Sequence, residues 1–206
     1  MNLPSIEIIT CDQGTPEWHA ARCGCVTASK FDCVLANGRG GAPSKTRQTY
    51  LYTLAGEILT GEVVESYKNA DMERGTLNEP EARAYYSLMT DNIVEEVGFL
   101  KRGQVGYSPD GLIGTDGLYE TKNKLPHLHI AALLANVLPP EHKAQVQGGL
   151  WVSEREWLDF HSYWRGLPPF ILRVYRDETY IAELSEGVEA FLGDLNDLVE
   201  KLRARS

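Results

Sequence analysis

The chain has 206 residues, of which 43% are hydrophobic and 24% charged, and these proportions predict one globular domain spanning residues 1–206 with a substantial core. Its formal net charge of −9 argues against a protein that coats DNA through a generally basic surface, although a local group of Lys and Arg is enough to bind phosphates. No apolar run approaches the ~20 residues of a membrane-spanning helix, and the first residues lack the basic and apolar regions of a secretory signal, so we expect a cytoplasmic protein that does not engage a membrane.

The first half of the chain is predicted to be helical. Thr15 is suited to cap a helix, and Pro16 follows at the first helical position, where the missing N–H of proline is tolerated. Apolar residues recur at helical spacing in the later segments, and Gly75 leads into the last of them. The predicted helices cover residues 17–34 with a break at Gly24, 46–59 and 79–89.

The second half of the chain is predicted to supply the strands. Short β-branched and aromatic runs end at Gly, Pro, Asn or Asp, and Thr115-Asp116-Gly117 has the composition of a hairpin turn. The predicted strands cover residues 93–99, 105–108, 112–113, 118–122, 157–164 and 170–175, with helices over 143–152 and 188–202. The terminal helix is amphipathic. This order predicts an α/β or α+β domain with a small mixed β-sheet flanked by helices.

One spacing of acidic and basic residues points to chemistry. Asp110 follows Ser108-Pro109 at a turn, and Glu120 and Lys122 follow on a predicted strand, where alternate side chains share one face. Mg²⁺ prefers oxygen ligands and takes one or two carboxylates from a protein, and such ions activate water for hydrolysis of a phosphodiester. The pattern predicts a divalent-metal nuclease site in which Lys122 orients or helps to deprotonate the attacking water.

Other polar residues are candidates for this site, each beside a simpler interpretation. Glu79 opens a predicted helix, so it is either a third carboxylate of the metal cluster or an acid stabilised by the helix dipole. One of Gln145 and Gln147 is expected to turn toward the site from the helix that carries both. Arg22 and Ser29 have the chemistry to bind a phosphate, but position alone favours a surface Arg and a helix-capping Ser.

The cysteines are confined to the first 33 residues. Their Cys-x-Cys spacing is not that of the usual zinc sites, and no second pair follows. Reduced thiols packed around a helix are the favoured interpretation, and a zinc site formed by His19, Cys23 and Cys25 is the alternative.

A locally basic run overlaps the candidate nuclease site, whereas acidic residues gather between residues 177 and 200. This distribution predicts a basic channel inside an acidic exterior. The members of the run are Lys101, Arg102, Lys122, Lys124 and Lys143, with His127, His129 and His142.

Four motifs together make the chain recognisable. They are Trp-His-x-x-Arg-x-Gly-x-x-Thr-Ala-Ser at residues 18–29, a Gly and Glu helix motif at 75–83, Ser-Pro-Asp-Gly with Glu-Thr-Lys at 108–122, and Ala-Gln-Val-Gln at 144–147 before Trp-Val. On these motifs the chain resembles the lambda-type phage exonucleases, the YqaJ-like viral recombinase family within the PD-(D/E)xK nuclease superfamily. The similarity extends from Glu17 to about Tyr180.

The resemblance implies a restriction-endonuclease-like core and a processive 5′→3′ exonuclease. Such an enzyme degrades one strand of linear double-stranded DNA and exposes 3′ single strands for recombination. Two Mg²⁺ ions, replaceable by Mn²⁺, would be held by Asp110, Glu120, Glu79 and the backbone carbonyl of Thr121. Lys122 would hold the nucleophilic water and Gln145 would line the same site.

The resemblance also implies how DNA is held and with what partners. Arg22, Ser29 and Ser108 would form the pocket for the 5′-phosphate. As a member of this family, the protein would form a homotrimeric ring around DNA and work beside a single-strand annealing protein. It would act in the cytoplasm of a bacterial host, encoded by a phage or prophage.

Three departures and two alternatives remain. Thr121 stands where the family pattern has an apolar residue, and residues 124–143 match the family poorly. All four cysteines are N-terminal, so we expect no iron–sulfur cluster. An endonuclease on the same scaffold would use the same site residues and is distinguished by cutting closed circular DNA. A DNA-end-binding scaffold without catalysis is disfavoured, because Asp110, Glu120 and Lys122 are all present.

Overall fold

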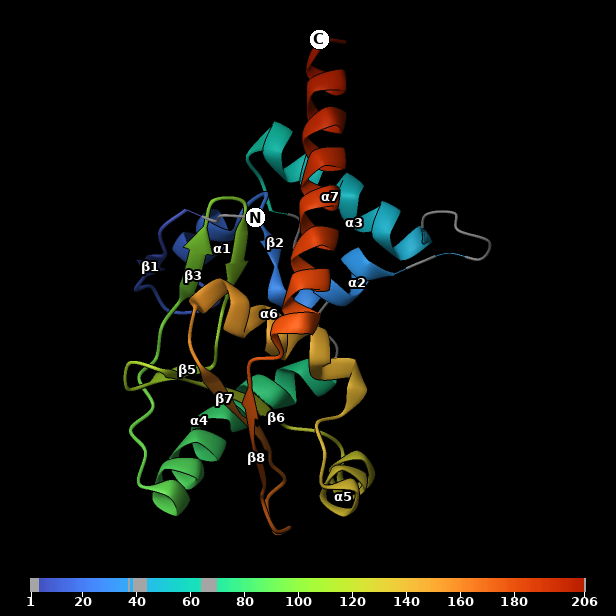
Figure 1. The fold of residues 1–206 in the computed structure, drawn as a ribbon. Coiled ribbons are helices and arrows are strands. Elements are labelled where there is room, and N and C mark those ends of the chain that lie inside the picture. Colours follow the sequence, from blue (N-terminus) through green and yellow to red (C-terminus); the bar gives the residue numbers. More distant parts are fainter. Residues whose placement is uncertain (1–3, 37, 39–43, 64–69, 206) are drawn as a thin grey trace.

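Two four-stranded sheets lie at the centre of the fold in the computed structural model (Figure 1), which describes residues 4–36, 38, 44–63 and 70–205. The first sheet has the order β1-β3-β4-β2 and the second the order β5-β6-β7-β8. Each is mixed, because β2 runs parallel to β4 and β6 parallel to β7, whereas the other pairs are antiparallel. The strands are β1 (Glu7–Ile9), β2 (Val26–Thr27), β3 (Phe99–Arg102), β4 (Val105–Tyr107), β5 (Gly111–Ile113), β6 (Gly117–Lys122), β7 (Trp157–Ser162) and β8 (Phe170–Tyr175).

Helices surround both sheets. Helix α4 packs against β6, α5 packs against β8, and α7 packs against α2, α3 and α6. The helices are α1 (Pro16–Arg22), α2 (Phe31–Leu35), α3 (Lys45–Thr60), α4 (Ala70–Thr90), α5 (Pro126–Ala135), α6 (Lys143–Ser153) and α7 (Glu178–Arg203), with 3-10 turns η1 (Ala28–Lys30) and η3 (Pro140–His142). The fold is therefore the predicted mixed α/β arrangement, divided into two small sheets.

Helix α6 joins the two halves of the fold, because it contacts β3 and β4 of the first sheet and β7 of the second. Nearly all of its residues are buried. A Cβ on Gly148 would lie 2.2 Å from the Phe31 ring, and one on Gly149 would lie 2.7 Å from the Tyr107 ring. The Gly-Gly pair thus allows α6 to approach α2 and β4 closely enough to bring Gln145 to the end of β6.

Local signals explain several boundaries. Thr15 caps α1 by accepting a hydrogen bond from the Trp18 backbone N–H, with Pro16 at the first position as predicted. The hairpin of β5 and β6 and the strand β8 also lie where the sequence predicted them. The described residues contain no helix long and apolar enough to span a membrane.

Two predictions about elements are wrong, and three elements were missed. Residues 93–99 do not form a strand, since Glu95 makes only an isolated bridge to Leu112 and β3 starts at Phe99. The helix predicted over 79–89 already includes Ala70, with Pro80 inside it. Gly75 was expected to lead into this helix, but it lies within α4, and Pro80 is accommodated in the helix interior. Helix α5 and the short strands β1 and β2 were not predicted at all.

Candidate active site

The β5–β6 hairpin brings Asp110 beside Glu120. Asp110 immediately precedes β5, and the next residue, Gly111, is paired with Tyr119 on β6. The Asp110 Oδ2 atom accepts a hydrogen bond from the Thr121 backbone N–H at 2.6 Å. The predicted pair of carboxylates therefore meets at one end of the hairpin, although ten residues separate them in the sequence.

Glu120 is the centre of the site. Its side chain is only 2% exposed, and its Oε1 atom accepts hydrogen bonds from Lys122 Nζ and Gln145 Nε2, both at 2.6 Å. The Oε2 atom accepts a hydrogen bond from the Tyr107 hydroxyl at 2.5 Å. Hydrogen bonds to an ionised group are stronger than those between neutral groups, so these three donors fix the orientation of the buried carboxylate.

The sequence analysis did not identify Tyr107. It lies at the end of β4 and is 1% exposed, and burial followed by the charge of Glu120 raises the pKa of its hydroxyl well above the usual range. The hydroxyl therefore stays protonated and donates. The only signal in the sequence was its position next to Ser108-Pro109-Asp110, which does not reveal a contact with β6.

Burial and nearby negative charges define the environment of Asp110. Burial raises the pKa of Asp110 well above its ordinary value, and the charges of Glu120 and Glu79 act in the same direction, against Lys122. Burial would lower the pKa of Lys122, but the attraction of Glu120 and Asp110 outweighs it and the pKa is raised. The site thus concentrates negative charge around one ammonium group, which favours an additional bound cation.

Glu79 reaches this site from the interior of α4, not from a helix start. The prediction that it opens a helix, and with it the helix-dipole alternative, is wrong because α4 includes Ala70. Its Oε1 atom accepts a hydrogen bond from Arg83 at 2.9 Å, and Arg83 also pairs with Glu96. Burial and the charge of Glu120 raise the pKa of Glu79. A cavity of about 290 Å³ is bordered by Glu79 and Asp110.

The donor set fits Mg²⁺ in its chemistry. Asp110, Glu120 and Glu79 supply oxygen atoms, and their mutual repulsion is what a divalent cation would relieve. In the described part of the chain, however, no three His, Cys, Asp or Glu side chains already form a metal cage.

The two glutamines of α6 have different roles. Gln145 points to Glu120, as described, whereas Gln147 is 3% exposed and lies on the opposite side. Gln147 donates a hydrogen bond to the Tyr175 carbonyl at 2.9 Å and accepts one from the Asp177 backbone N–H at 2.8 Å. Of the pair left open by the sequence, Gln145 is therefore the one turned to the site, and Gln147 fastens α6 to the start of α7.

Two of the three predicted phosphate-binding residues meet. Arg22 Nη1 and Trp18 Nε1 both donate to the Ser108 hydroxyl, at 2.9 and 3.0 Å, and the Arg22 guanidinium lies 4.1 Å from the centre of the Trp18 ring. Burial lowers the pKa of Arg22. Ser29 is exposed on η1 and contacts the Thr27 hydroxyl at 3.4 Å; no hydrogen bond within the described residues links it to Arg22 or Ser108.

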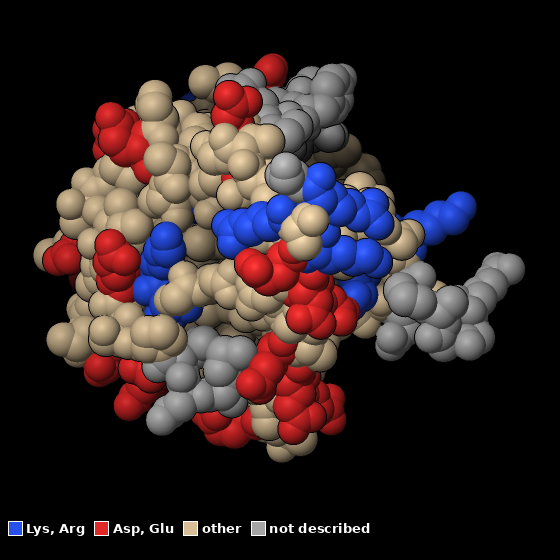
Figure 2. Space-filling model, turned by 90° about the horizontal axis from the view of Figure 1, so that it is seen from above, with Lys and Arg blue, Asp and Glu red and all other residues tan. Residues whose placement is uncertain are grey.

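The predicted basic run is largely paired with acids. Lys124 pairs with Glu141 at 3.3 Å and Lys143 with Asp177 at 3.0 Å, whereas Arg102 is buried and pairs with Glu154. His129 is buried in contact with Ser162. On the face seen from above, Lys and Arg form a compact group bordered by Asp and Glu (Figure 2). Of the run, Lys122 lies in the site itself.

The N-terminal cysteines do not assemble with His19 into a metal site in the part of the chain that is described. All four thiols are free. Cys23 Sγ lies 3.5 Å from the Glu57 carbonyl, and burial raises the pKa of Cys23 and of Cys25.

Comparisons with known proteins show which family the chain is similar to. Residues 17–156 match the model of the YqaJ-like viral recombinase domain. The structure is similar to an alkaline exonuclease (LHK-Exo) from Laribacter hongkongensis, with a TM-score of 0.83 and 38% sequence identity over 93% of this chain and 97% of that one; the LHK-Exo complex with dAMP gives the same values. A phage-related exonuclease from Haemophilus somnus 129PT shares the fold, with a TM-score of 0.66 and 14% identity over 86% of this chain and 96% of that one. No match was found among curated protein sequences.

Proposed function

Because the chain belongs to the YqaJ-like viral recombinase family and has the fold of a PD-(D/E)xK nuclease, we propose that it is a metal-dependent exonuclease that degrades one strand of linear double-stranded DNA in the 5′→3′ direction. The observation that carries the proposal is the convergence of Asp110, Lys122 and Gln145 at the buried Glu120 carboxylate. Buried carboxylates with one adjacent ammonium group are suited to binding a cation and an attacking water.

The metal-binding groups would be the carboxylates of Asp110, Glu120 and Glu79 and the backbone carbonyl of Thr121. When bound, Mg²⁺ supplies Lewis-acid stabilisation of the phosphate charge and lowers the pKa of water. Thr121 is held in place because its N–H donates to Asp110. Two Mg²⁺ ions, with Mn²⁺ as a substitute, are consistent with this number of oxygen donors.

The other side chains position these groups and the water. Gln145 and Tyr107 hold the Glu120 carboxylate from opposite oxygens. Lys122, charged and 2.6 Å from Glu120, lies where it can hold the nucleophilic water by donating a hydrogen bond. Since Tyr107 and Gln145 both donate to Glu120, we assign both to positioning of that carboxylate.

The direction of cleavage is proposed from the Arg22–Ser108 contact. Ser108 precedes Asp110 by two residues, so a 5′-phosphate bound by Arg22 and Ser108 would be anchored beside the carboxylates. Ser29 would join this pocket through its exposed hydroxyl. Fixing the terminal phosphate places the following phosphodiester at Asp110 and Glu120, which releases one nucleotide in each step.

The proposal extends to the surroundings of the enzyme. A homotrimeric ring, with DNA passing through it, would make degradation processive by keeping the DNA enclosed. The 3′ single strands that remain are the substrate of a single-strand annealing protein in a bacterial cell infected by a phage or carrying a prophage. The supporting observations are the family membership and the likeness to LHK-Exo.

Substitution of the central residues tests the assignment. Asp110→Ala, Glu120→Ala and Lys122→Ala are each expected to abolish cleavage of linear duplex DNA in Mg²⁺ while circular dichroism shows a folded protein. Asp116→Ala is the matched control, since Asp116 lies on the same hairpin but is exposed. Cleavage by all three central variants at the rate of the control would refute the site.

An endonuclease on the same scaffold is the alternative. It would use the same carboxylates, and covalently closed circular duplex separates the two, because an exonuclease has no end to act on.

A further inference from the structure

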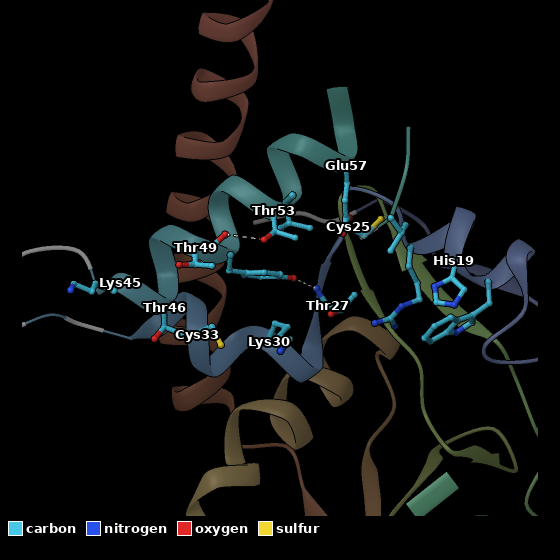
Figure 3. Close-up of a pocket in the computed structure, with 15 residues that line it drawn as sticks. His19, Cys25, Thr27, Lys30, Cys33, Lys45, Thr46, Thr49, Thr53 and Glu57 are labelled. Carbon is cyan, nitrogen blue, oxygen red and sulfur yellow. Dashed lines mark hydrogen bonds between the residues drawn. The ribbon is translucent and has the colours of Figure 1, made fainter. Parts of the chain in front are cut away.

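A second cavity lies outside the carboxylate site. It has a volume of about 660 Å³ and is bordered by Arg22, but not by Asp110, Glu120 or Lys122. Its walls are α1, β2, η1, α2 and α3, and Figure 3 shows it as a groove that runs from His19 at one end to Lys45 at the other. Since Arg22 contacts Ser108, the groove continues from the proposed 5′-phosphate pocket in the direction away from the metal-binding groups.

The groove has the lining of a phosphate-backbone site. Thr46, Thr49 and Thr53 follow one another on the same face of α3, with Lys30 on the opposite wall (Figure 3). Lys45 stands at the outer end, in the first turn of α3. Hydroxyl groups, ammonium groups and a helix N-terminus are donors that hold phosphate oxygens without reading the bases.

The exposed charged side chains of this groove that form no ion pair with a described residue are positive, although the net charge of the chain is −9. Lys30 and Lys45 are both exposed, and neither forms an ion pair with another described residue. Glu57, the acid in the lining, is 7% exposed and accepts a hydrogen bond from the Gly24 backbone N–H at 2.9 Å. A negatively charged ligand would therefore meet two unpaired cations.

Another side chain already covers one face of each of two aromatic rings in the groove, Tyr50 and Trp18. The Tyr50 ring stacks on Phe191 with centres 5.6 Å apart, and Arg22 covers Trp18. Stacking of bases on these two rings is therefore more restricted than in many single-strand sites. Contacts to the DNA backbone, which are independent of sequence, are the main ones that the groove offers.

We propose that this groove holds a single-stranded 5′ extension, so that the enzyme also cleaves 5′-tailed duplex ends within the strand. The inference rests on the proposed function. An internal phosphate of the extended strand would occupy the Arg22–Ser108 pocket, and the nucleotides on its 5′ side would follow the groove past Lys30 toward Lys45. The cavity volume of about 660 Å³ lies within the ~300–1,000 Å³ that is usual for a ligand site.

The reaction remains hydrolysis of one phosphodiester. The hydroxyl of water bonds to phosphorus, the bond from phosphorus to the 3′ oxygen breaks, and that oxygen takes a proton. The product is an oligonucleotide that contains the whole extension and one further nucleotide, with a 3′-hydroxyl. The remaining strand begins with a 5′-phosphate and is ready for nucleotide-by-nucleotide degradation.

Two substrates with a radioactive 5′-phosphate test the proposal: a blunt duplex and the same duplex with a short single-stranded 5′ extension. The expected labelled products in Mg²⁺ are a mononucleotide from the blunt end and an oligonucleotide from the extended end. A labelled mononucleotide as the first product from the extension, or no cleavage of the extension while the blunt end is degraded, would overturn the proposal. Failure on both substrates would instead contradict the proposed exonuclease.

Variants show whether the groove is responsible. The double variant Lys30→Gln with Lys45→Gln is expected to degrade blunt ends as before and to lose the oligonucleotide product. The control, Lys201→Gln with Arg205→Gln, removes the same charge at exposed positions outside the groove and is expected to keep it.

Binding measured in Ca²⁺ gives a second readout. Each single-strand phosphate contact contributes about 0.7 to the slope of log affinity against log salt. The groove variant lacks two such contacts, so its loss of affinity between roughly 50 and 200 mM salt is expected to be about seven-fold smaller than that of the native protein. The expectation applies to the extended substrate. Equal slopes for both proteins on that substrate would overturn the role of Lys30 and Lys45.

Discussion

The hydrogen bond from Tyr107 to Glu120 is expected to stabilise the protein and to position the carboxylate. Tyr107→Phe keeps the ring, which is 1% exposed, and removes only the hydroxyl that lies 2.5 Å from Glu120 Oε2. A hydrogen bond to a charged group contributes about 1.5–3 kcal/mol, and Glu120 would keep Lys122 and Gln145 as partners. We therefore expect the free energy of unfolding to fall by about 2 kcal/mol.

Urea denaturation and thermal melting measure this change. For a protein of this size about 2 kcal/mol corresponds to a decrease in Tm of about 4–8 °C. Cleavage of duplex DNA should also slow, because Glu120 is held less firmly. Tyr175→Phe is the matched control, since that ring is 64% exposed, and it should change neither quantity. A Tyr107→Phe protein with unchanged stability and cleavage rate would refute the reasoning that Tyr107 supports an ionised Glu120.

Three further predictions follow from other contacts. Gln145→Ala should slow cleavage, because Glu120 loses a donor, whereas Gln147→Ala should leave the cleavage rate nearly unchanged and lower the free energy of unfolding by about 2 kcal/mol, because the Tyr175 carbonyl and the Asp177 N–H lose their partner; equal effects on cleavage would contradict the separate roles. Burial lowers the pKa of His161 from 6.5 to about 4. The neutral side chain therefore contributes fully to the free energy of unfolding above pH 6.5, and this contribution is lost as the pH falls toward 4. At pH 4.5 this loss is roughly 2–3 kcal/mol; unfolding of His161→Phe, followed by urea titration at pH 7.5 and 4.5, should lack that part of the pH dependence. Arg22→Ala should reduce the preference for 5′-phosphorylated over 5′-hydroxyl ends, and an unchanged ratio of rates would remove Arg22 from the pocket.

The part of the site formed by neighbouring strands was predictable from sequence. A turn before one strand and alternation along the next are local features, and they are sufficient to place Asp110, Glu120 and Lys122 together. The hairpin and its turn were predictable for the same reason. Assignment of Gln145 required one more fact, the face of α6 that is turned to β6, which the pattern of the helix left undecided.

Contacts between distant elements were not predictable. Tyr107 reaches Glu120 from a different sheet, and Trp18 is half-buried beneath Arg22. The start of α4 was misplaced because Gly75 and Pro80 are locally unfavourable in a helix, yet packing of α4 against β6 outweighs that preference. Ser29 was assigned by motif, and its distance from the Arg22–Ser108 contact depends on the turn of η1, which a motif does not specify.

The central claim is tested most directly by digestion of a linear duplex in Mg²⁺, with a 5′-phosphate at one end only, a 3′ label on each strand, and closed circular duplex in a parallel reaction. The account predicts that the strand beginning with the phosphate is degraded, that its complement remains as a single strand, and that the circle stays intact. Cleavage of the circle, or degradation from the 3′ ends, would contradict it.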